Sequence, residues 1–149
     1  MKRELQSTIY INCSPREIIN ALTDSQRIKQ WWGVADCYIS DKDGAPYLLK
    51  WNADAESNYL VWTAIIRLSN KRNLLELENV FMISPGMGIK GPYVILFESS
   101  RENDKSSLTV TQKGFTKDNA SEQFIEIMGE QWSVILIQLK QFLENTSPA

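Results

Sequence analysis

A helical pattern near the C-terminus is the strongest constraint on the fold. Large apolar residues recur there at steps of three and four, which places them on one face of a helix: Phe124, Met128, Trp132, Ile135, Leu136, Leu139 and Leu143. Asn119, with Glu122 three residues later, has the spacing of a helix-capping pair, so we expect a helix over about residues 119–145. Such a helix is roughly 40 Å long and needs an equally long apolar surface to cover its apolar face.

Strand-like segments supply that surface. Runs rich in β-branched and aromatic residues, separated by turn residues, predict strands over about residues 5–12, 34–40, 46–51, 59–69, 74–83, 93–99 and 107–113. We expect a polar connection over about 52–58, turns at about 41–44 and 70–73, and a hairpin turn at about 101–105. This order predicts an α+β fold, in which an antiparallel sheet twists and curls around the long helix.

Two short helices are expected after the first strand. Ser14 can cap the first of them, Pro15 fits its first position, and Glu17 can return a hydrogen bond to the cap. This helix should end near Asp24, which can itself cap a second helix running to about Gln30.

Composition excludes several functional classes. The chain of 149 residues is 43% hydrophobic, has a net charge of −2 and has no histidine. This predicts one domain over residues 1–149, with no nucleic-acid partner. No cofactor or metal is expected, since histidine is absent and the two cysteines lack CxxC spacing. No signal peptide or long apolar run is present, so we expect a cytoplasmic protein with no membrane insertion.

The segment from Gly86 to Gly91 spells GxGxxG. A dinucleotide site needs this motif between a strand and a helix, whereas here Pro92 and a strand-like run follow it. We therefore interpret residues 84–92 as an irregular loop, with a mobile lid at a cavity mouth as the alternative.

Aromatic residues suggest where a ligand could bind. Tryptophan and phenylalanine most often build solid core, but their number on both the strands and the last helix predicts an apolar cavity between sheet and helix. The candidate ligand-binding residues are Trp31, Trp32, Trp51, Trp62, Phe81, Phe97, Phe115, Met128 and Trp132. Trp31 and Trp32 are adjacent, so we expect one to face inward and the other to lie near a rim. Trp132 should lie on the sheet-facing side of its helix.

Glu76 and Glu78 carry the alternative of an enzyme. They share one face of a strand and could supply an acid and a base, although a solvated outer face is the explanation that we expect. No GxSxG or SxxK nucleophile motif is present, so we assign no catalytic residue.

Three segments in order resemble one known family. Residues 9–18 are similar to its opening strand and first-helix entry, residues 23–32 to its paired-tryptophan segment, and residues 113–115 with 128–143 to its Gly-Phe and Leu-rich last helix. On these residues the chain resembles the family of homologues of the activator of heat-shock protein 90 ATPase, within the START and Bet v-allergen helix-grip superfamily.

The resemblance implies a helix-grip domain with a cavity between sheet and long helix. Members bind apolar small molecules, act as co-chaperones or, in related branches, catalyse cyclisation or dehydration of polyketides. Our leading hypothesis is therefore non-catalytic binding of a small hydrophobic or aromatic ligand. The alternatives are a chaperone-cofactor-like interaction domain and a polyketide cyclase-like enzyme, in a monomer or homodimer.

Overall fold

The predicted order of elements is confirmed. The computed structural model describes residues 3–54, 58–69 and 73–146. Its elements are β1 Arg3–Ile11, α1 Pro15–Thr23, α2 Ser25–Trp32, β2 Asp36–Ile39, β3 Pro46–Asp54, β4 Asn58–Ser69, β5 Leu74–Ser84, β6 Gly88–Glu102, β7 Lys105–Phe115 and α3 Glu122–Thr146. The connection predicted over 52–58 and the turn predicted over 70–73 lie partly outside the described residues.

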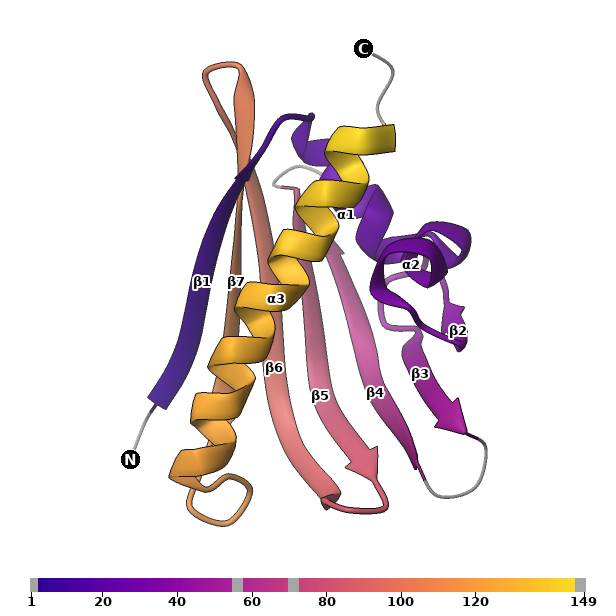
Figure 1. Cartoon of the computed structure of the whole chain (residues 1–149), viewed down its shortest axis with the longest axis vertical. Coiled ribbons are helices and arrows are strands. Elements are labelled where there is room, and N and C mark those ends of the chain that lie inside the picture. The colour runs from indigo at the N-terminus through magenta and orange to yellow at the C-terminus, as the bar shows by residue number, and fades with distance from the viewer. Residues whose placement is uncertain (1–2, 55–57, 70–72, 147–149) are drawn as a thin grey trace.

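One antiparallel sheet forms the body of the molecule. Its strand order is β1-β7-β6-β5-β4-β3-β2, so β2 to β7 form a meander and β1 pairs with β7. Figure 1 shows α3 lying across one face of the curved sheet, with α1 and α2 beside its C-terminal half. This is the helix-grip arrangement that the sequence predicts.

An irregularity in β5 changes which of its side chains face α3. Leu75 and Leu77 are buried under the helix, and the register with β6 then shifts between Leu77 and Val80. Asn79, within the shift, has a left-handed φ of 50°. Such a bulge inserts an extra residue, bends the strand and reverses the alternation of side chains. Val80 and Met82 are therefore buried on the helix side, where unbroken alternation would have placed Phe81.

The long helix packs as predicted along its apolar stripe. Trp132 is only 1% exposed, and Leu139 and Leu143 are also buried against the sheet. The prediction that Trp132 faces the sheet is confirmed. The opposite side of the helix leaves Ile137 half exposed.

The start of α3 differs from the expectation. The helix begins at Glu122, and Ser121 caps it by accepting a 3.0 Å hydrogen bond from the backbone N–H of Phe124. Asn119 instead stabilises the preceding turn, because its side chain accepts from the Thr116 N–H at 2.9 Å and donates to the Gly114 carbonyl at 3.0 Å. Asparagine suits both a helix cap and a turn, and here its side chain forms its hydrogen bonds within the turn.

The prediction of a loop over residues 84–92 is wrong. Only residues 85–87 form a turn, and β6 begins at Gly88, which pairs with Ser84. Gly91 and Pro92 of β6 lie opposite a single residue of β5, Phe81. A bulge is a position where a strand tolerates proline, because no ladder hydrogen bond is required of its missing N–H.

The first helix is capped as expected, with one difference. Ser14 Oγ accepts a 3.2 Å hydrogen bond from the Glu17 N–H, and Pro15 holds the first helical position. The Glu17 carboxylate, however, accepts from Arg27 Nη1 of α2 at 3.0 Å, which ties the two short helices together.

Replacing Ser14 by Ala should lower the free energy of unfolding by about 1 kcal/mol, because the Glu17 N–H loses its acceptor. The measurement is the midpoint of chemical denaturation. The control is Arg16→Ala, because Arg16 lies in the first turn of the same helix and takes no part in the cap. An equal loss in both variants would assign the effect to the helix rather than to the cap.

Candidate functional site

Four tryptophans from different elements form one cluster beside α3. The rings of Trp32 and Trp51 lie 5.2 Å apart, and each lies 5.3 Å from Trp62. Their interplanar angles run from 65° to 88°, so these contacts are edge to face. Trp132 of α3 lies behind them, 5.9 Å from Trp62. Such contacts stabilise by about 0.5–1.5 kcal/mol each beyond buried area and hold the rings in fixed orientations.

Hydrogen bonds fix two of these rings further. Trp51 Nε1 donates to the backbone carbonyl of Trp32 at 3.0 Å, joining β3 to the end of α2. Trp132 Nε1 donates to Oε1 of the buried Gln112 on β7 at 2.8 Å. Trp32 is the last residue of α2 because Gly33 adopts a left-handed φ of 71°, which ends the helix and leaves the ring beside the sheet.

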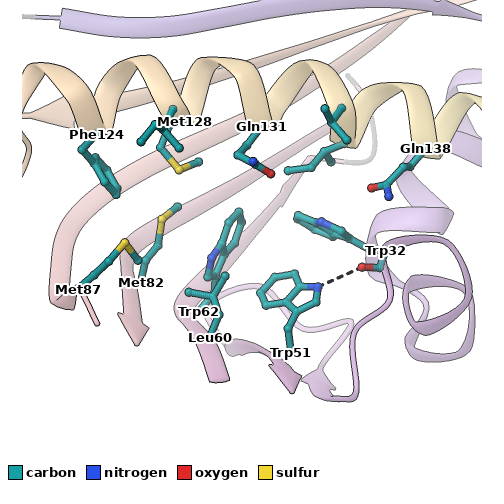
Figure 2. A pocket seen from close by; sticks show the side chains of 13 residues that line it. Trp32, Trp51, Leu60, Trp62, Met82, Met87, Phe124, Met128, Gln131 and Gln138 are labelled. Atoms are coloured by element: carbon teal, nitrogen blue, oxygen red, sulfur yellow. Dashed lines mark hydrogen bonds between the residues drawn. The ribbon is translucent and has the colours of Figure 1, made fainter. Parts of the chain in front are cut away.

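A pocket of about 460 Å³ opens in front of this cluster, between α3 and the sheet. Its lining residues come from α2, β3, β4, β5, the β5–β6 turn and α3 (Figure 2): Trp32, Trp51, Leu60, Trp62, Met82, Met87, Phe124, Ile127, Met128, Gln131, Val134, Ile135 and Gln138. The volume falls within the range of small-molecule sites, about 300–1,000 Å³.

The pocket is open to solvent along α3 and the hairpin tip. Ile127 and Val134 are 48% and 51% exposed, and Met87 in the β5–β6 turn is 40% exposed. Gln131 and Gln138 lie on the same stripe of α3 and line the same rim. A ligand could therefore enter without any strand separating from the sheet.

The lining is apolar and carries no ionisable side chain. Its polar groups are the indole N–H groups and the amides of Gln131 and Gln138. Met82, Met87 and Met128 all contribute, and these are the chain's three methionines besides Met1. Methionine adapts its shape and makes favourable sulfur–aromatic contacts, so this wall can fit an aromatic surface.

The family of the chain follows from a sequence comparison. The family model described as "Activator of Hsp90 ATPase homolog 1-like protein" matches residues 12–144, from the turn after β1 into the last turns of α3. The chain belongs to this family. No curated protein sequence matches it.

Several solved structures share this fold. The Mll3558 protein from Rhizobium loti has a TM-score of 0.77 at 14% identity, with 96% of this chain and 98% of that chain covered. Aha1 from Colwellia psychrerythraea, solved as a dimer, has a TM-score of 0.71 at 18% identity, with coverage of 95% and 96%. CalU16 from Micromonospora echinospora has a TM-score of 0.66 at 18% identity, with coverage of 95% and 76%. At these identities the likeness establishes the fold alone.

Four of the nine candidate residues line the pocket of this family member: Trp32, Trp51, Trp62 and Met128. Two others, Phe97 and Trp132, lie in the core behind it, with ring centroids 5.8 Å apart.

Three candidates lie elsewhere. Trp31 is buried behind Trp32, with ring centroids 5.0 Å apart, so the expected division between an inward ring and a rim ring is wrong: both are at most 7% exposed. Phe81 lies on the face of the sheet away from α3, since the β5 bulge reverses its direction. Phe115 packs at the end of β7 against Tyr93, 5.1 Å away.

Glu76 and Glu78 do not point into the pocket. They alternate with the buried Leu75 and Leu77 and so lie on the opposite face of the sheet. Partial burial, a hydrogen bond that protonated Glu76 donates to the Glu78 carboxylate, and the negative charge of Glu78 raise the pKa of Glu76, while Arg67 pairs with Glu78 at 3.3 Å. The hypothesis of a carboxylate base in the cavity is therefore wrong.

The described residues give no sign of a metal site or a membrane span. Among them, no group of three or more His, Cys, Asp or Glu side chains could hold a metal ion. No helix in the described ranges is long and apolar enough to cross a bilayer.

Sequence reasoning missed most of the α3 wall. The missed lining residues are Leu60, Met82, Met87, Phe124, Ile127, Gln131, Val134, Ile135 and Gln138. Part of this wall has a signal in the sequence, because residues 127, 131, 134 and 138 are spaced as one stripe of a helix. The glutamines in this stripe are typical of a surface that faces solvent. The stripe becomes the rim of a pocket only because the sheet lies beside it.

Proposed function

We propose that this chain binds a small hydrophobic or aromatic molecule in the pocket between α3 and the sheet. One observation carries the proposal: a pocket of about 460 Å³ walled by tryptophan, methionine and aliphatic side chains, with no ionisable group. Burial of apolar ligand surface against such a wall stabilises a complex by about 25 cal/mol per Å². Membership of a helix-grip family supports the same site.

The test is a titration with N-phenyl-1-naphthylamine, an uncharged probe whose fluorescence rises in apolar surroundings. We expect saturable binding of one probe per chain. Trp51→Ala removes the half-buried ring at the pocket wall and should weaken binding about tenfold, the equivalent of about 1.4 kcal/mol of lost contact.

Tyr38→Ala is the matched control, because Tyr38 is an aromatic residue that is 58% exposed and lies outside the pocket lining. It should bind the probe as the unchanged chain does. Equal weakening by both substitutions, or probe binding that never saturates, would reject the pocket as the site.

A second candidate is a protein-interaction role of the chaperone-cofactor type. It is favoured by the family itself and by three half-exposed apolar residues on α3: Ile127, Val134 and Ile137. Clusters of exposed apolar side chains often mark interaction sites. A change in the ATPase rate of an added heat-shock protein 90, lost in Ile137→Ser, would support it. Ile137 lies outside the pocket lining, so this variant leaves the ligand site intact.

A further inference from the structure

The strongest remaining signal in the pocket is an unsatisfied hydrogen-bond donor. Trp62 is 3% exposed, and its Nε1 is buried without a hydrogen-bond partner within the described part of the chain. Its neighbours Trp51 and Trp132 both have acceptors, the Trp32 carbonyl and the Gln112 side chain. A buried donor left unpaired is costly, and native proteins rarely keep one.

The surroundings of Trp62 supply few polar groups. Figure 2 shows the nitrogen-bearing edge of its ring on the side of Leu60 and Met82, which line the same pocket. An ordered water needs two to four polar partners to be held in such a site. The remaining polar side chains of the lining include Gln131 and Gln138, which lie on α3 at the exposed rim. A ligand carrying a fixed acceptor satisfies the Trp62 N–H better than water does.

The charge of the ligand follows from the lining. None of the thirteen lining side chains is ionisable, so nothing there compensates the burial of a charge. A tryptophan cage for a cation would need space between the rings. Trp32, Trp51 and Trp62 instead contact one another, with centroids 5.2–5.3 Å apart. These rings therefore present a surface for a neutral ligand and do not enclose a cation.

We infer that the pocket takes an uncharged, planar aromatic molecule bearing a carbonyl-type oxygen, and that this oxygen accepts the hydrogen bond of Trp62 Nε1. The inference rests on the proposed function and narrows its ligand class. Aromatic surface packs against the tryptophans and the methionine thioethers. Met82 and Leu60 must shift slightly to let the oxygen approach, which the three rotatable bonds of methionine allow.

The test compares fluorene with 9-fluorenone, two tricyclic molecules of nearly the same shape that differ by a carbonyl. We expect the unchanged chain to bind 9-fluorenone about fivefold more tightly, as one net hydrogen bond provides. In Trp62→Phe, which keeps an aromatic ring but removes the donor, the preference should disappear. Leu60→Ala alters the same wall but leaves the Trp62 donor in place, so it should keep the preference for 9-fluorenone. 9-Oxofluorene-2-carboxylate, with its charge, should bind at least tenfold more weakly than 9-fluorenone.

NMR spectra of the indole N–H groups give a second readout, made on the unchanged chain, for which Trp62→Phe serves only to assign one signal. The signal absent from Trp62→Phe belongs to Trp62, and it should move downfield with 9-fluorenone but not with fluorene. If both compounds bind equally and Trp62→Phe changes nothing, the acceptor inference is overturned while the proposed function stands. Equal binding of the carboxylate overturns the requirement for a neutral ligand. If neither neutral compound binds, both the inference and the proposed function are rejected.

Discussion

Trp132→Ala should lower the free energy of unfolding by about 3–5 kcal/mol, near the upper end for a large-to-small core change. The ring is 1% exposed and contacts Phe97, Trp62 and Trp32 at centroid distances of 5.8, 5.9 and 6.5 Å. Its removal also takes the indole N–H from the side-chain oxygen of Gln112, whose amide nitrogen already has no partner among the described residues. For a chain of this size the thermal midpoint should fall by about 10 °C or more.

The measurement is thermal and chemical denaturation of Trp132→Ala beside Gln131→Ala. Gln131 is the preceding residue of the same helix, but it is exposed, so its replacement should change stability by no more than about 0.5 kcal/mol. Trp132→Phe, which keeps one aromatic ring but loses the N–H and part of the buried volume, should fall between the two. A Trp132→Ala variant as stable as the control would show that the helix does not present this face to the sheet.

The features that the sequence predicts well are those governed by local periodicity. The three- and four-residue spacing around Trp132 and Leu139 requires an apolar partner whatever the rest of the chain does, and the only surface long enough is the sheet. The short helices also depend on local interactions, because the side chains of Ser14 and Asp24 cap them by accepting hydrogen bonds from backbone N–H groups two or three residues later. Element order and the buried face of α3 therefore follow from short-range rules.

The pocket depends on contacts between distant segments, which the spacing of apolar residues along the sequence does not reveal. One left-handed residue, Asn79, reverses the direction of every later side chain in β5, and so exchanges Phe81 for Met82 in the wall. Met87 reaches the rim only because the glycine-rich segment pairs as a strand and places its turn there. An asparagine in mid-strand is a weak sign of a bulge, and the sequence offers no stronger one.

Gly91→Ala should be among the most destabilising single substitutions in the β5–β6 hairpin. Gly91 has a φ of 142°, and a Cβ there would lie 2.4 Å from the Val80 carbonyl oxygen and 3.0 Å from Cδ1 of Phe81. Backbone atoms cannot yield as a flexible side chain can. Steric overlap and a disfavoured φ each cost about 1–3 kcal/mol, so we expect a loss of about 3 kcal/mol in the free energy of unfolding.

Gly86→Ala supplies a control from the same GxGxxG segment. No atom lies within 4 Å of the position where its Cβ would stand, so the substitution should change stability by no more than about 0.5 kcal/mol. The contrast separates two explanations of the motif. A phosphate-binding loop would need its glycines for close approach of a ligand, whereas a bulged strand needs Gly91, where β6 meets the backbone of β5, and has no need of Gly86. Equal stability of the two variants would contradict the bulge as the reason for this glycine.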